Sequence, residues 1–124
     1  MPAVPIKLKF KSIDIPFDTK NHQNKVLEEL IFDDPNTISI DYNTIKFPLI
    51  IRKWQKGDYF YPIGLKGKKK LSKFFKDEKM SLLEKENAWI LCTANNNIIW
   101  VIGKRLDEHF KVTKTTSKLL KVKY

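Results

Sequence analysis

Two runs of β-forming residues joined by asparagines constrain the fold of this chain more than any other feature. Residues 89–93 (WILCT) and 98–102 (IIWVI) are rich in isoleucine, valine, leucine and tryptophan. Residues 94–97 lie between them and include three asparagines, which tolerate the left-handed conformation of a tight connection. Both runs are apolar at consecutive positions, which is typical of strands covered on both faces. The sequence therefore predicts an antiparallel hairpin inside a sheet or between two layers.

Shorter patterns complete the fold prediction. Further strands are expected at residues 6–11, 37–41, 47–52, 110–112 and 119–124, and Ile13 and Ile15 could continue the first of them up to Pro16. The apolar spacing in residues 26–32 fits either a helix or a strand, and the pattern does not decide between them. Together these patterns predict an α+β fold of mostly antiparallel strands in a small sheet or sandwich, with two short helices in the middle of the chain.

The two helices have different signals. On a helical wheel of residues 69–76, one leucine and two phenylalanines fall on one face and three lysines fall on the opposite face. This helix is expected to anchor its aromatic side chains and to point its lysines outward. Residues 81–84 (SLLE) have the form of a capping box, which predicts a second helix at residues 82–86.

Length and composition indicate one globular domain. The chain has 124 residues, of which 42% are hydrophobic and 12% aromatic, enough for an ordinary core. The single cysteine, Cys92, cannot form an internal disulfide and is expected to be a small buried core residue. The chain shows no signal-peptide pattern and no apolar run long enough to span a bilayer. We expect a cytoplasmic protein in a reducing compartment.

The positive charge is concentrated in residues 52–79. This stretch holds ten of the 24 Lys and Arg residues and three of the 14 acids, a net charge of +7. Residues 1–51 carry a net charge of −1, and residues 80–124 carry +4. A concentrated basic patch is typical of polyanion binding, so we expect a nucleic acid as partner. An anionic membrane surface, an acidic protein and a merely solvated lysine face are the alternatives.

The basic stretch also contains the aromatic residues that stack on unpaired bases. Trp54, Phe60, Phe74 and Phe75 are expected in the core, whereas Tyr59 and Tyr61 alternate with Phe60 and are better candidates for exposure. The candidate phosphate-binding cations are Arg52, Lys53, Lys56, Lys66, Lys68, Lys69, Lys70, Lys73 and Lys76. The loop at residues 64–67 and a helix N-terminus directly after it could add backbone N–H donors.

The chain carries no recognisable catalytic motif. Residues 64–69 (GLKGKK) depart from a phosphate-binding loop, because Pro62 occupies the first glycine position and Lys69 stands where Ser or Thr is needed. His22 and His109 have no cysteine pair or acidic cluster at zinc-ligand spacing. The acids near residues 77–86 are better explained as ion-paired surface groups than as a magnesium site.

The order of the residues adds a resemblance. The blocks that carry it are RKWQKGDYF (52–60), PIGLKG (62–67), KKLSKFF (69–75), DEK (77–79), IWVIGKRLD (99–107) and FKVT (110–113). Together they closely resemble the C-terminal domain of bacterial tRNA(Ile)-lysidine synthetase over residues 37–124. Residues 1–36 resemble no family and are a segment of uncertain role, expected to pack on the same domain.

The resemblance implies a parent enzyme, a ligase that uses ATP and lysine to make lysidine at the wobble cytidine of an isoleucine tRNA. In that family an N-terminal ATP-pyrophosphatase domain with a Ser-Gly-Gly-x-Asp-Ser loop does the chemistry, and this chain has no such motif. The chain is therefore expected to be a C-terminal piece with no cofactor of its own. ATP with magnesium belongs to the missing catalytic domain.

The family's C-terminal domain is similar to a module of phenylalanyl-tRNA synthetase β chains and helps to hold the tRNA, particularly its acceptor end. The implied partners are therefore tRNA and the enzyme's own N-terminal domain, with a homodimer as a further option and no membrane. The predicted RNA contacts are Arg52, Lys53, Lys66, Lys68, Lys69, Lys70, Lys73, Lys76 and Arg105. The predicted loop-forming residues are Gly57, Asp58, Gly64 and Gly67.

Two other functions remain open at this point. The first is an interaction or dimerisation domain that docks on the catalytic domain without touching RNA, through the apolar hairpin and Trp100. The second is a free-standing enzyme acting on phosphorylated substrates, against which the missing catalytic motif argues.

Overall fold

The computed structural model describes residues 6–15, 34 and 36–124. They belong to two compact units, one made of residues 1–45 and 110–124 and the other of residues 46–109. In the described part of the chain, no helix has the length and apolar character needed to cross a membrane.

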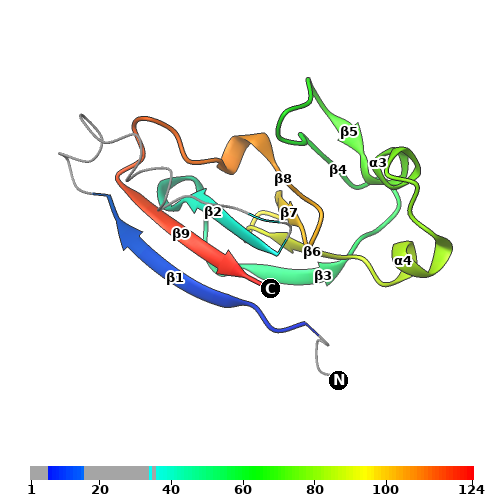
Figure 1. The fold of residues 1–124 in the computed structure, drawn as a ribbon, viewed down its shortest axis with the longest axis horizontal. Helices are drawn as coiled ribbons and strands as arrows, with labels where there is room; N and C mark the ends of the chain where they lie inside the picture. Colours follow the sequence, from blue (N-terminus) through cyan, green and yellow to red (C-terminus); the bar gives the residue numbers. More distant parts are fainter. Residues whose placement is uncertain (1–5, 16–33, 35) are drawn as a thin grey trace. The chain divides into compact units, whose positions relative to one another are not determined.

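The first unit contains a three-stranded antiparallel sheet. Its central strand is β9 (Lys118–Lys123), which lies between β1 (Lys9–Asp14) and β2 (Thr37–Asp41) (Figure 1). Val122 faces Phe10 on one side and Ile38 on the other in the strand register. A 3₁₀ turn, η1 (Tyr42–Thr44), follows β2. Both β9 and β2 contribute three buried residues, whereas β1 contributes none.

The strand expected at residues 6–11 is only partly correct. It runs over Lys9–Asp14 instead, because all six of these residues pair with the six residues of β9. The predicted half-buried alternation holds for Ile6 and Leu8, which are half-buried between exposed lysines, but it fails at Phe10, which is 47% exposed. β1 is an edge strand and is paired with β9 alone.

The second unit contains a four-stranded antiparallel sheet. Its order is β3 (Ile50–Lys53), β6 (Trp89–Cys92), β7 (Ile98–Val101) and β8 (Arg105–Leu106). The predicted hairpin is β6–β7, and all residues of β7 are buried, as two-sided apolar runs indicate. Asn96 takes the left-handed conformation in the connection, with φ of 67°. The hairpin prediction is confirmed.

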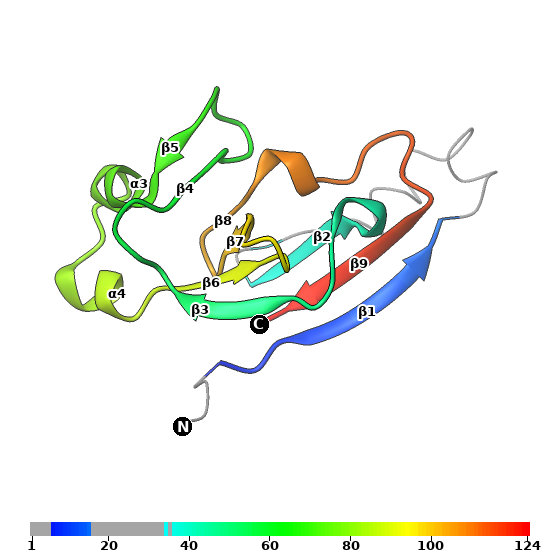
Figure 2. The same cartoon turned by 180° about the vertical axis from the view of Figure 1, so that it is seen from behind.

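A two-stranded ribbon and two helices complete this unit. The ribbon pairs β4 (Tyr59–Phe60) with β5 (Lys69–Lys70), and β5 leads directly into α3 (Leu71–Asp77). The second helix, α4 (Leu82–Glu86), lies beside the ends of β3 and β6 in both views (Figures 1 and 2). Its predicted capping box is present.

One aromatic cluster holds the ribbon and α3 on the sheet. Phe60 packs edge-on against Phe74 with ring centroids 5.2 Å apart, and Trp54 packs edge-on against Phe75 at 5.0 Å. The same buried cluster contains Leu71, Phe74, Phe75, Met80, Ile90, Cys92, Ile98 and Val101. The expected core positions of Phe60, Phe74, Phe75 and Cys92 are confirmed, whereas Trp54 is only partly buried and packs against the cluster from its side. The predicted α+β class with antiparallel strands and two short central helices is also confirmed.

Two element predictions are wrong. The helix expected at residues 69–76 begins at Leu71, because Lys69 and Lys70 are extended and pair with β4. The strand expected at residues 110–112 is replaced by a 3₁₀ turn, η2 (Glu108–Phe110), followed by one isolated bridge at Lys111. The turn forms because the carboxylate at position 107 accepts the N–H of residue 109. The undecided segment 26–32 lies outside the described residues.

Replacing Leu71 tests the role of the aromatic cluster. Leu71 is fully buried, so Leu71→Ala is expected to lower the free energy of unfolding by about 2–5 kcal/mol. Leu82 is 71% exposed, and Leu82→Ala is expected to change it by less than about 0.5 kcal/mol. Urea unfolding followed by tryptophan fluorescence measures both, and equal effects would contradict this assignment of the core.

Candidate nucleic-acid interface

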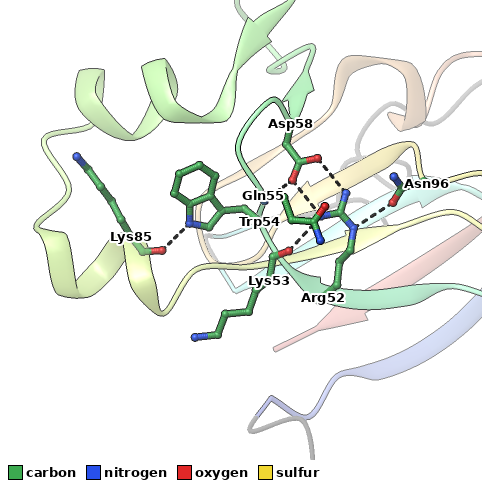
Figure 3. Close-up of polar contacts among 7 residues, drawn as sticks. All are labelled: Arg52, Lys53, Trp54, Gln55, Asp58, Lys85 and Asn96. Atoms are coloured by element: carbon green, nitrogen blue, oxygen red, sulfur yellow. Dashed lines mark hydrogen bonds and ion pairs between the residues drawn. The ribbon is translucent and has the colours of Figure 1, made fainter.

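Asp58 organises the start of the basic stretch. Its carboxylate receives a two-pronged ion pair from Arg52, with Nη1–Oδ2 at 2.9 Å and Nη2–Oδ1 at 3.0 Å, and also accepts the Gln55 N–H (Figure 3). Its backbone carbonyl accepts the N–H of Leu71. One residue thus joins β3, the loop before β4 and the start of α3. Gly57, with φ of 96°, gives the loop its left-handed step.

The same contacts set the ionisation of this pair. The hydrogen bond from Asp58 raises the pKa of Arg52 above its ordinary value. Burial alone would raise the pKa of Asp58, yet the hydrogen bonds from Arg52 and Gln55 outweigh it and leave this pKa below its ordinary value. The pair is therefore fully charged at neutral pH.

Arg52 has little donor capacity left for a ligand. Besides Asp58, its guanidinium donates to the Lys53 carbonyl and, through Nε, to Asn96 of the β6–β7 connection. Four of its five N–H bonds are therefore used inside the protein. Its side chain is 18% exposed, so the main role of Arg52 is to hold the loop in shape.

Arg105 has a similar place at the next loop. Its Nη1 donates to the Ile63 carbonyl at 3.2 Å, and the Ile63 N–H donates to the Leu106 carbonyl. The loop that follows turns through Gly64 and Gly67, whose φ angles are 82° and 78°. Arg105 therefore fixes the base of the loop that carries the lysines.

Five of the predicted lysines surround one open hollow of about 540 Å³ on the second unit. The hollow lies over the loop after β4, strand β5 and the first turn of α3. Its lining residues are Leu65, Lys66, Gly67, Lys68, Lys69, Lys70 and Lys73. The lining contains no acidic side chain, which makes the hollow attractive to an anion.

One carboxylate borders this group of lysines. Asp77 at the end of α3 pairs with Lys69 at 2.5 Å and with Lys73 at 3.4 Å. The hydrogen bond from Lys69 lowers the pKa of Asp77 below its ordinary value. Asp77 thus offsets one of the five charges, whereas Lys66, Lys68 and Lys70 are exposed and have no acidic partner among the ion pairs of the described chain.

Two other predicted contacts lie outside the hollow. Lys53 donates to the Glu86 carbonyl at 2.6 Å and sits over the Trp89 ring, which ties β3 to α4. Trp54 beside it donates from Nε1 to the Lys85 carbonyl (Figure 3). Lys76 is exposed on α3 and is not among the lining residues.

The sequence prediction missed a polar cluster near the ribbon. Asp107 is buried and accepts the N–H groups of Tyr61 and His109. It also contacts the His109 ring, with Nδ1–Oδ1 at 3.0 Å, and this ring packs edge-on against Tyr61. An aspartate two residues before a histidine is an Asx-turn signal, but it indicates a turn and gives no hint of the Tyr61 contact.

Neither a nucleotide-binding loop nor a metal cluster is found in residues 6–15, 34 and 36–124. A strand, β5, separates Gly67 from α3, so the expected helix N-terminus does not directly follow the loop, and phosphate-binding loops require that arrangement. Among the residues that the model describes, no three His, Cys, Asp or Glu side chains are grouped so that they could hold a metal ion. The hollow therefore offers ammonium groups and an open surface.

The fold and the hollow define a small α+β module that presents a lysine-rich surface. Residues 49–122 match the family model described as the TilS substrate C-terminal domain. The chain therefore belongs to this family, and the prediction of a tRNA(Ile)-lysidine synthetase C-terminal domain is confirmed.

Curated relatives agree with the family. The chain is 39% identical to the tRNA(Ile)-lysidine synthase of Parabacteroides distasonis over 120 residues, which are 97% of this chain and 25% of that protein. It is 42% identical to the one of Caldanaerobacter subterraneus over 84 residues, which are 68% of this chain and 18% of that protein. The first alignment extends into residues 1–36, which had no predicted counterpart. The chain spans a quarter or less of the length of these relatives.

Two solved structures share the fold. A crystal structure of a TilS C-terminal domain has a TM-score of 0.71 at 18% identity and covers 94% of this chain and 80% of that one. An N-terminal fragment of the phenylalanyl-tRNA synthetase β subunit from Pyrococcus horikoshii has a TM-score of 0.67 at 16% identity and covers 94% of this chain and 38% of that one. The expected similarity of fold to this synthetase module is confirmed.

The ion pair of Asp58 gives a prediction for stability. Asp58→Asn removes the charge that Arg52 requires and is expected to lower the free energy of unfolding by about 1–3 kcal/mol at pH 7. Because the folded-state pKa of Asp58 is lowered, its contribution is present above the unfolded-state value of about 4 and is lost as the pH falls through the folded-state value. The difference between wild type and variant should therefore shrink at acid pH.

Urea unfolding at several pH values between 7 and 3 measures this difference. Glu78→Gln, which removes an exposed carboxylate of the same unit, serves as the control and is expected to change stability by less than about 0.5 kcal/mol. A difference between wild type and Asp58→Asn that stays constant with pH would contradict the assigned role of the ion pair.

Proposed function

We propose that this chain is the substrate-tRNA-binding domain of a tRNA(Ile)-lysidine synthase. The parent enzyme makes lysidine at the wobble cytidine of an isoleucine tRNA from ATP and lysine, in the cytoplasm. Its catalytic domain, with ATP and magnesium, is not part of this chain. Here the domain holds the tRNA, and its expected contact is the acceptor end.

The observation that carries this proposal is the group of five lysines around the hollow. Lysine ammonium groups bind phosphates as mobile point charges, and several of them along one surface suit a polyanion better than a single small anion. Lys66, Lys68 and Lys70 are exposed and are the strongest candidates for direct contacts. The family membership and the two kinds of relatives support the same reading.

The predicted contact residues divide into two groups by their geometry. The lysines of the hollow are proposed to bind phosphates, with Lys76 as a further contact at its side. Arg52, Lys53 and Arg105 are proposed to position the loops, because their donors are engaged with Asp58, Glu86 and Ile63. Arg52 has one N–H left through which it could still reach a phosphate. The loop-forming Gly57, Gly64 and Gly67 all have positive φ.

A docking role is the second candidate. The hairpin and Trp100 cannot provide the surface, because Trp100 is 1% exposed and its neighbours in β7 are buried as well. The exposed pair Leu82 and Leu83 on α4, at 71% and 68%, gives a more suitable contact for the parent's catalytic domain or a second copy. Such a contact would be insensitive to salt, which distinguishes it from phosphate binding.

A charge-reversal pair tests the proposed function. Lys66→Glu/Lys70→Glu changes two exposed residues of the hollow, and it is expected to weaken binding of an isoleucine tRNA transcript by about tenfold or more. The slope of log affinity against log salt should fall by about two units, since two phosphate contacts are lost. Fluorescence anisotropy over a salt series measures both quantities.

Lys9→Glu/Lys11→Glu is the matched control. It makes the same change in net charge on β1 of the first unit, and both lysines are exposed and do not line the hollow. It should leave the affinity within about threefold of wild type, since a purely long-range effect is screened at physiological salt. If both double variants are folded and lose the same affinity for tRNA, binding depends on the net charge of the domain and not on the lysines of the hollow. Binding unchanged by the Lys66 and Lys70 reversals would refute the proposed role of the hollow.

A further inference from the structure

The two aromatic residues of β4 face opposite sides of the ribbon. Phe60 points into the core and is 1% exposed, whereas Tyr59 before it is 49% exposed. Tyr61, the residue after β4, is half-buried. The rings of Tyr59 and Tyr61 meet edge to face with centroids 6.3 Å apart. The ribbon therefore exposes Tyr59, with Tyr61 behind it, beside a lysine of the hollow.

The ring of Tyr59 adjoins one of the hollow's own lysines. The ammonium of Lys68 lies over this ring, 4.4 Å from its centroid. Both side chains are exposed, and the ammonium has no acidic partner among the described ion pairs. A cation over an exposed aromatic face is held weakly, so the ring face can be vacated when a stronger partner for the ammonium arrives.

Tyr61 also contacts His109 and Asp107. The ring of His109 meets it edge to face at 4.5 Å, and the Nδ1 of His109 is held by the buried carboxylate of Asp107. Because a carboxylate oxygen accepts, Nδ1–H is the donor in this contact. Asp107 also accepts the Tyr61 N–H at 2.9 Å. Asp107 thus holds the Tyr61 backbone directly and its ring through His109, and the Tyr59 ring contacts the Tyr61 ring.

We propose that Tyr59 and Lys68 form a subsite for one unpaired ribonucleotide, with the base stacked on the Tyr59 ring and its phosphate on the Lys68 ammonium. Tyr61, His109 and Asp107 act as positioning residues that hold the platform. In the free protein the ammonium covers the ring, and in the complex it moves to the phosphate while the base takes its place on the ring. This subsite rests on the proposed function, because its nucleotide continues the strand whose other phosphates lie on the lysines of the hollow.

The subsite makes the domain prefer RNA that has an unpaired end next to a helical stem. A base within a duplex is already stacked on both faces and cannot lie on Tyr59, whereas an unpaired base has a free face. The lysines of the hollow contact phosphates, which paired and unpaired nucleotides both carry, so they do not read whether a base is paired. The preference therefore comes from the tyrosine and can be separated from the contribution of the lysines.

A pair of hairpin RNAs tests this inference. One hairpin carries a four-nucleotide 3′ tail with 2-aminopurine at one tail position, and the other has the same stem with a blunt end. The 124-residue chain is expected to bind the tailed hairpin about tenfold more tightly, and stacking on Tyr59 should change the 2-aminopurine fluorescence. Tyr59→Leu should abolish both the gain in affinity and the change in fluorescence, whereas Tyr59→Phe keeps the ring and should retain both.

Tyr124→Leu is the matched control, because Tyr124 is 51% exposed and lies on the other unit. It should retain the preference for the tail, and thermal melts establish that each variant is folded. Equal affinity of wild type for the two hairpins, or a preference that survives in Tyr59→Leu, overturns the subsite while the proposed function stands. Failure to bind either hairpin or whole tRNA overturns the subsite and the proposed function together.

Discussion

The bidentate ion pair between Arg52 and Asp58 is the interaction on which the basic surface depends. Asp58 uses its side chain to accept from Arg52 and Gln55, and its carbonyl to accept from Leu71. The start of β4 and the start of α3 are therefore fixed relative to β3 by a single residue. Charge-assisted bidentate pairs have a narrow geometry, so they position a loop better than one neutral hydrogen bond does. The lysines can then be mobile, because the backbone that carries them is held.

The aromatic cluster beneath the ribbon supplies the hydrophobic stabilisation that offsets repulsion among the lysines. Five lysines on one surface repel each other, and Asp77 offsets only part of that charge. Burial of Phe60, Phe74 and Phe75 stabilises the same segment from below, by about 1.5–3 kcal/mol for each side chain. A hydrophobic anchor with an exposed cationic face is a stable way to present charge to an anionic partner.

The sequence predicted the parts of this structure that depend on local pattern. The β6–β7 hairpin and the capping box of α4 were predicted correctly because the partners are neighbours in the chain and each residue type has a direct role in the turn or cap. The charge distribution located the lysines in one stretch of sequence, and the structure places five of them around one hollow.

The β4–β5 pairing could not be predicted in the same way. Each strand has two residues, too few for a period to be visible, and Lys69 and Lys70 fit a helical wheel as well as a strand. This short pairing sets where the hollow lies, because it holds the lysine loop to β4 at Tyr59 and Phe60. The contact of Lys68 with Tyr59 follows from it, across nine positions of sequence.

The arginines and the lysines have different proposed roles, and the geometry of their contacts explains why. The planar guanidinium groups of Arg52 and Arg105 match fixed oxygens, namely a carboxylate and a backbone carbonyl, and each lies at the base of a loop. The lysines lie farther out, on the loop and on β5, and a flexible ammonium can follow a phosphate whose position varies along an RNA strand. If the arginines were the main RNA contacts, binding would have to break the ion pair that holds the surface together. In the proposed complex, such a surface would bind RNA through its lysines while the Arg52–Asp58 ion pair stays intact.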